Sequence, residues 1–223
     1  MSRSDEEEVE LLKNLWQEYG KPVIAGVAIT VIAIFGYKAY QKNQLETAAD
    51  SSQLYQSLLD ATRTAQGQPL SEQQKATVTH VVETLQADYQ SSEYAAFATL
   101  FQAREQVLDN DLEGARSSLE WVLDQKPDLE VEMVARARLA RVMLGQSDDN
   151  AQAALDVLAK ATPEAGFVAT IESARGDAYL AMGQKDKARE SYEKALEAAR
   201  TDGESRPLLQ FKLDDLAANV KEG

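Results

Sequence analysis

The pattern of apolar and polar residues changes abruptly near the N-terminus. Residues 9–19 place apolar side chains at intervals of three or four, which predicts an amphipathic helix. Residues 22–37 then form an uncharged run, PVIAGVAITVIAIFGY, bracketed by Lys21 and Lys38. A helix of these 16 residues rises about 24 Å against a hydrocarbon core of roughly 30 Å, and snorkelling lysines and the neighbouring apolar residues extend it. We therefore predict one transmembrane helix over residues 22–40.

Two features argue against removal of this run as a signal peptide. Residues 5–8 read Asp-Glu-Glu-Glu, whereas a signal peptide begins with a short basic region. No pair of small residues at the spacing of a cleavage site follows the run. The run is predicted to remain as a signal anchor, with the buried helix of a soluble protein as the alternative. The flanking lysines and tyrosines disfavour that alternative, because such side chains prefer the headgroup level of a bilayer.

Basic residues around the span favour a cytoplasmic N-terminus by a narrow margin. The basic residues near the span are Arg3, Lys13 and Lys21 before it and Lys38 and Lys42 after it. Residues 1–21 would then form an acidic cytoplasmic segment that contains the amphipathic helix. Residues 41–223 would form a domain outside the cytoplasm, which in a bacterium is the periplasm.

Beyond the anchor the apolar positions keep a helical period that short polar turns interrupt. The predicted helices cover residues 41–66, 71–88, 92–109, 111–125, 128–145, 149–160, 164–182, 185–200 and 204–219. No segment shows sustained alternation with a period of two, so no strand is required. The predicted fold class is all-α.

The predicted helices repeat in pairs. The clearest pair, IESARGDAYLAMGQKDKARESYEKALEAA, carries small and aromatic residues at set intervals, namely Gly176, Tyr179, Gly183, Ala188, Tyr192 and Ala195. This spacing resembles the tetratricopeptide repeat, in which small residues let two antiparallel helices approach and aromatic residues fill the gaps. Glu172 and Arg175 depart from the usual residues of its first helix. Gly183 is expected at the turn, in a left-handed conformation.

Two further copies make the repeat regular. One covers residues 95–127, with Asn110 at its turn, and a degenerate copy follows it. The doublets Ala103-Arg104, Ala140-Arg141 and Ala174-Arg175 mark corresponding helices and lie 37 and 34 residues apart. We therefore predict a tetratricopeptide-like helical-repeat solenoid that its last helix caps, with a non-repeating bundle as the alternative.

Charge and composition narrow the classes of partner. The formal net charge is −14, and residues 43–223 carry 31 acidic and 18 basic residues, a net charge of −13. A surface this acidic argues against nucleic acid and would be repelled by anionic lipid headgroups. The absence of cysteine excludes disulfides, thiol catalysis and cysteine-ligated metal sites.

The sequence offers no catalytic constellation. The single histidine, His80, lies within a predicted helix, and Asp148-Asp149 lack the spaced ligands of a calcium loop. No phosphate-binding loop, nucleophile elbow or metal-binding helix motif is present. We predict no enzymatic activity, no cofactor and no metal. No binding residue can be named, because one sequence does not separate the core face of a solenoid from its exposed face.

The order of these features resembles the YfgM family, ancillary subunits of the bacterial SecYEG translocon. The stretches that carry the resemblance are Trp16 to Gly20, the anchor end Gly36-Tyr37-Lys38-Ala39-Tyr40, Leu139-Ala140-Arg141-Val142, and Arg175-Gly176-Asp177-Ala178 ahead of Gly183 and Ala188. Together they extend from residue 16 to residue 188, more than three-quarters of the chain, in the family's order.

The resemblance implies an inner-membrane protein with a cytoplasmic N-terminus and a periplasmic repeat domain. It also implies association with the SecYEG translocon and with the membrane-anchored prolyl isomerase PpiD. The implied role is to pass secreted proteins to periplasmic chaperones. Two alternatives remain at this stage, namely a scaffold for cell-envelope assembly or division, and a cytosolic adaptor with inverted topology.

Overall fold

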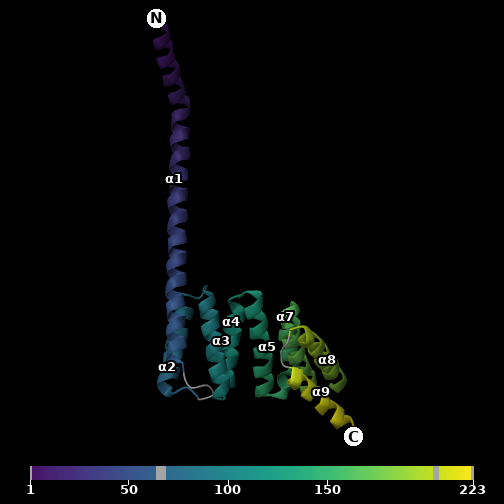
Figure 1. Ribbon diagram of the computed structural model, residues 1–223. Coiled ribbons are helices and arrows are strands. Elements are labelled where there is room, and N and C mark those ends of the chain that lie inside the picture. The colour runs from purple at the N-terminus through teal and green to yellow at the C-terminus, as the bar shows by residue number, and fades with distance from the viewer. Residues whose placement is uncertain (1, 64–68, 203–205, 222–223) are drawn as a thin grey trace. The chain divides into compact units, whose positions relative to one another are not determined.

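The computed structural model describes residues 2–63, 69–202 and 206–221 (Figure 1). The described residues form helices and connecting turns, with no strand among them. The chain divides into two compact units, residues up to 50 and residues from 51 onward.

The first unit consists of most of helix α1 (Ser2–Ala61). The amphipathic helix before the apolar run continues into it, through Pro22, without a break. The helix predicted over residues 41–66 is the end of α1, which stops at Ala61, and residues 64–66 lie outside the described residues. The continuity has a simple cause: residues 37–61 contain neither glycine nor proline, so nothing interrupts the helix.

Among the described residues, α1 is the only helix with a segment that is long and apolar enough to cross a membrane. The few polar groups of this segment are satisfied within the helix, as a hydrocarbon environment requires. The Thr30 hydroxyl donates to the Gly26 carbonyl at 2.8 Å. At its C-terminal end the Tyr37 hydroxyl accepts from Gln41 at 3.1 Å, which begins the polar part of the helix.

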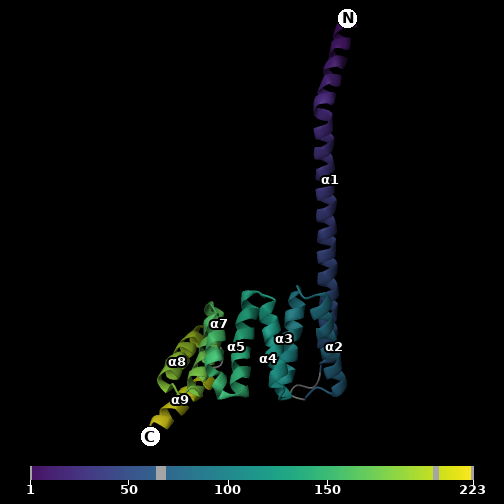
Figure 2. The same cartoon turned by 180° about the vertical axis from the view of Figure 1, so that it is seen from behind.

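The second unit is a row of antiparallel helices that runs from the end of α1 to the C-terminus (Figures 1 and 2). Its elements after α1 are α2 (Glu72–Asp88), α3 (Glu93–Leu108), α4 (Leu112–Asp124), α5 (Leu129–Gln146), the short 3₁₀ helix η1 (Asp148–Asn150), α6 (Ala151–Ala159), α7 (Ala165–Ala181), α8 (Lys185–Asp202) and α9 (Arg206–Lys221). These bounds agree with the sequence-based prediction to within a few residues. The extra turn residue of the middle repeat lies in η1, where Asn150 Nδ2 donates to the Met143 carbonyl at 3.0 Å.

Polar side chains cap the N-terminal ends of several helices of the second unit. Ser71 and Gln74 form a capping box at α2, in which each residue binds the other's backbone N–H. Asp111 accepts from Gly114 N at 2.9 Å at the start of α4, and Asp128 accepts from Val131 N at 3.0 Å at the start of α5. Each bond satisfies a donor that the first helical turn leaves without a partner.

Left-handed residues end the first helices of two repeats. Asn110 has φ 61° after α3, and Gly183 has φ +70° after α7. In both turns the left-handed residue donates to a carbonyl three residues back, and the next residue donates to a carbonyl five residues back. These paired bonds form a Schellman motif. The turn positions predicted from the repeat spacing are thereby confirmed.

Replacing Gly183 by alanine tests this turn. A Cβ in the left-handed region costs roughly 1–2 kcal/mol, so Gly183→Ala should lower the free energy of unfolding by about that amount. Urea unfolding of the full-length protein in mild detergent, followed by circular dichroism, gives the difference. Gly166→Ala is the matched control, because Gly166 has an ordinary helical backbone and open space around its Cβ position. A loss of stability of similar size in both variants would contradict this account of the turn.

The core of the second unit is a stack of three clusters of buried, mostly apolar residues. One cluster joins the end of α1 to α2 and α3, the central cluster spans α3 to α7, and a third joins α7, α8 and α9. The alanines of the three doublets, Ala103, Ala140 and Ala174, are all buried at corresponding places in this stack. α3–α4, α5–α6 and α7–α8 therefore form the repeats, and α9 packs on the last of them.

Candidate functional site

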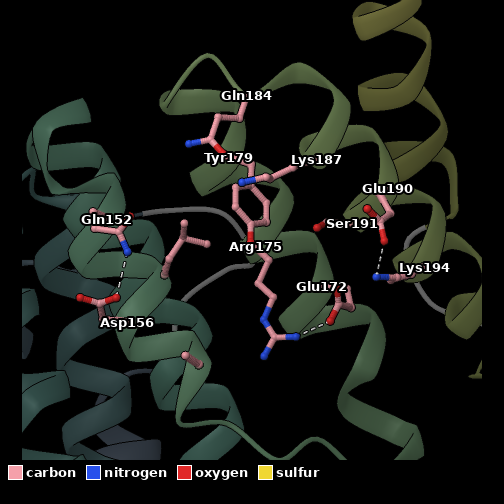
Figure 3. Close-up of a pocket in the computed structure, with 12 residues that line it drawn as sticks. Gln152, Asp156, Glu172, Arg175, Tyr179, Gln184, Lys187, Glu190, Ser191 and Lys194 are labelled. Atoms are coloured by element: carbon pink, nitrogen blue, oxygen red, sulfur yellow. Dashed lines mark hydrogen bonds and ion pairs between the residues drawn. The ribbon is translucent and has the colours of Figure 1, made fainter.

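Two grooves in the repeat unit are candidate binding surfaces. The first, called the α6–α8 groove here, has a volume of about 630 Å³ and lies between α6, α7 and α8 (Figure 3). Its lining residues are Gln152, Leu155, Asp156, Ala159, Glu172, Arg175, Tyr179, Gln184, Lys187, Glu190, Ser191 and Lys194. Acidic and basic side chains are equal in number among them, so the groove has no excess charge.

Four of the six charged side chains of the α6–α8 groove pair with one another, and one of the four also binds the protein backbone. Arg175 pairs with Glu172 and also donates to the Leu158 carbonyl at 3.1 Å. Lys194 donates to Glu190 at 2.8 Å, and this hydrogen bond lowers the pKa of Glu190 (Figure 3). These contacts occupy most of the charged groups that a charged ligand would need.

The second groove is apolar and bordered by arginines. This arginine groove has a volume of about 400 Å³ and lies between α3, α4 and α5. Its lining residues are Ala103, Arg104, Val107, Leu108, Leu112, Leu119, Arg138, Arg141, Val142 and Gly145. Ala103, Leu119 and Val142 are buried, whereas Val107 and Leu108 are 42% and 64% exposed. The groove thus combines three cations with exposed apolar side chains and has no acidic residue in its lining.

Arg138 is the arginine with the fewest partners in this groove. Its Nη1 donates to the Leu100 carbonyl at 3.3 Å, and no described carboxylate forms a salt bridge with it. Partial burial of the guanidinium and the positive charges of Arg104 and Arg141 lower the pKa of Arg138. The guanidinium therefore lies in a positive field that no neighbouring acid compensates.

Arg141 connects the arginine groove to a carboxylate shared by several helices. Arg141 Nε lies 3.6 Å from Asp177 Oδ2 of α7. The other oxygen of Asp177 accepts from the Tyr192 hydroxyl of α8 at 2.7 Å and from Lys212 Nζ of α9. Burial, with the negative charge of Asp177, raises the pKa of the Tyr192 hydroxyl well above its usual value, so it remains a hydrogen-bond donor.

The residues that the sequence analysis considered for chemistry lie apart from both grooves. His80 is exposed on α2, and Asp148 and Asp149 are exposed in η1. Among the described residues no three acidic or histidine side chains gather where they could hold a metal ion.

Sequence reasoning used Arg104 and Arg141 only as markers of the repeat and did not identify the arginines of the second groove as a binding surface. A signal was present, because three arginines occur within six residues of α5 in an acidic domain. Arg138 and Arg141 share a helix face and line the groove, whereas Arg136 pairs with Glu132 at 2.6 Å and donates to the Val157 carbonyl. Only the packing of α5 against α3 shows which of these arginines line the groove and which is paired with an acid of its own helix.

Known proteins share both parts of this architecture. A family model described as a tetratricopeptide repeat-like domain matches residues 13–218. A protein of Neisseria gonorrhoeae named ancillary SecYEG translocon subunit is 32% identical over 215 residues, which cover 95% of this chain and 97% of the relative. The chain belongs to the family of ancillary SecYEG translocon subunits.

Other ancillary SecYEG translocon subunits agree with this assignment. The Escherichia coli protein of that name is 29% identical over 96% of this chain and 97% of its own length. The Haemophilus influenzae protein is 29% identical over 87% of this chain and 89% of its own. The family resemblance and the all-α fold class, one apolar N-terminal helix followed by tetratricopeptide-like repeats, are confirmed.

Proposed function

We propose that this chain is a non-enzymatic, membrane-anchored interaction protein that associates with the SecYEG translocon. The observation that carries the proposal is the likeness to ancillary translocon subunits over nearly the whole chain, with the apolar part of α1 included. A helical-repeat array is suited to this role, because it offers an extended surface for peptides or partner helices. The two grooves of the repeat unit are such surfaces.

The proposed location is the bacterial inner membrane. Residues 1–21 form a cytoplasmic segment, residues 22–40 the transmembrane signal anchor in the lipid bilayer, and residues 41–223 the periplasmic repeat domain. The basic residues before the span and the apolar helix support this arrangement. Anchoring raises the effective concentration of the repeat domain beside any partner in the same membrane.

The finer role that we propose is to help pass secreted proteins to periplasmic chaperones. The further proposed partners are the membrane-anchored prolyl isomerase PpiD and the chaperones or client polypeptides themselves. An acidic repeat domain held close to the membrane is repelled by anionic headgroups, which leaves its grooves available to polypeptides.

Copurification tests the association. A tagged full-length chain extracted in mild detergent is expected to retain subunits of the SecYEG translocon, detected by mass spectrometry. A chain tagged identically but carrying an unrelated transmembrane helix and domain controls for non-specific retention. Recovery of division or wall-synthesis proteins without translocon subunits would favour an envelope scaffold instead. Recovery of the free protein alone would contradict the proposal.

Protease treatment of intact spheroplasts tests the topology. Digestion of the domain after residue 41 from outside, with residues 1–21 protected, is the expected result. A domain that resists digestion until the membrane is lysed would lie in the cytoplasm, and the proposed periplasmic role would be wrong.

A further inference from the structure

We propose that the arginine groove binds a short, acidic and apolar segment of a partner polypeptide. The inference rests on the proposed role as an interaction protein, and it names the site and the chemistry of the partner. Shape, charge and contrast with the other groove support it in turn.

The apolar surface of the groove favours a ligand with apolar side chains. Val107 and Leu108 expose large side chains at the end of α3, next to a floor that Leu119 and Val142 close. Burying such surface against a ligand is favourable in proportion to the area removed from water. The volume of about 400 Å³ lies within the roughly 300–1,000 Å³ of ordinary ligand pockets, so it accepts a few side chains and not a folded domain.

The charge of the groove favours a ligand with carboxylates. Arg104, Arg138 and Arg141 line it, and no acidic residue does. Arg104 and Arg141 each have one acidic partner outside the lining, Glu105 at 3.4 Å and Asp177 at 3.6 Å, and Asp177 is shared with Lys212. Arg138 has none among the described residues. A carboxylate placed between the arginines would relieve their mutual repulsion and gain charge-assisted hydrogen bonds.

Contrast with the α6–α8 groove shows that an excess of positive charge is not a general property of grooves in this domain. That groove is larger, yet its cations are balanced by acids in its own lining. The domain around both grooves is acidic, with a net charge of −13 for residues 43–223. A local group of arginines without acids gives specificity for an acidic segment, because the net negative charge of the surrounding domain disfavours such a segment at most other places.

A binding measurement with the full-length protein in detergent tests the inference. The probe is a short fluorescent peptide in which glutamate alternates with leucine and phenylalanine, and fluorescence anisotropy reports its Kd. Two matched peptides replace every glutamate by lysine, or every leucine and phenylalanine by serine. The acidic, apolar peptide is expected to bind at least tenfold more tightly than either, and its affinity should fall as salt is added.

Variants of the protein locate the binding. Arg138→Gln is expected to weaken binding of the acidic, apolar peptide roughly tenfold, the effect of removing one charge-assisted hydrogen bond. Arg116→Gln is the matched control, since Arg116 lies on α4 outside the groove and pairs with Glu120 of its own helix at 2.9 Å. Thermal unfolding of each variant shows whether it is folded. If Arg138→Gln does not fold, Arg104→Gln is used in its place, because Arg104 is exposed.

Several results would overturn the inference. These are equal binding of the acidic and basic peptides, equal loss in Arg138→Gln and Arg116→Gln, or displacement of the peptide by phosphatidylglycerol vesicles but not by excess unlabelled peptide. The last result would assign the arginines to a lipid headgroup. Copurification of the wild-type chain with the translocon is scored separately, so a failure of the groove and a failure of the proposed function are distinguishable.

Discussion

A chain that carries both Val27→Arg and Val31→Arg is expected to lose its stable attachment to the membrane. The two valines lie one helical turn apart on α1, and their side chains are 59% and 44% exposed, so the helix itself does not shield them. Each arginine near the centre of a span costs about 2.5–3.5 kcal/mol of insertion free energy. The two substitutions together should therefore raise the free energy of membrane insertion by about 5–7 kcal/mol. Carbonate washing of membranes followed by immunoblotting measures the remaining attached fraction.

The paired substitutions Val27→Leu and Val31→Leu are the control for this experiment. Leucine keeps the apolar surface and the helical propensity, so this variant should remain attached like the wild-type chain. Retention of the double-arginine variant after washing would mean that the apolar part of α1 is not the anchor.

Gly176→Ala is expected to lower the free energy of unfolding by about 3 kcal/mol, the upper end of the usual cost of overpacking a core. A Cβ at Gly176 would lie 2.3 Å from Cε1 and 2.5 Å from Cδ1 of Tyr192. The Tyr192 ring cannot readily shift away from the added Cβ, because Tyr192 is fully buried and its hydroxyl donates to Asp177. Urea unfolding followed by circular dichroism gives the loss from the shift of the midpoint.

A double-mutant cycle shows whether the Tyr192 ring is the cause. In a Tyr192→Leu background the clash is absent, so adding Gly176→Ala should cost much less than it does in the wild-type chain. An equal cost in both backgrounds would place the effect somewhere other than the contact between α7 and α8.

The repeats could be predicted because their signals are local. Gly183 and Asn110 mark turns that require a left-handed backbone, and the alanine doublets recur at a repeat period. Gly176 and Tyr192 were recognised as repeat positions from spacing alone, although their close contact is visible only once α7 and α8 are packed.

Two features were not evident from the apolar pattern alone. The apolar run ends at Tyr37, but a helix ends only at a turn signal, and α1 therefore continues to Ala61. The arginine groove depends on which neighbour each face of α5 meets. Spacing places Arg138 and Arg141 on one face, but only packing shows that this face borders exposed apolar residues of α3.

The C-terminal end of the repeat unit depends on one side chain, Asp177, for several of its contacts. An array in which each hairpin contacts only its neighbours opens from its termini, and the order of opening depends on how the last elements are fastened. One carboxylate on α7 holds side chains from α5, α8 and α9 at once. Loss of that single charge, by Asp177→Asn, removes the ion pairs with Arg141 and Lys212 together, although an amide oxygen can still accept from the Tyr192 hydroxyl. Local unfolding would then begin at α9, and the central helices, which pack through buried alanines, would unfold last.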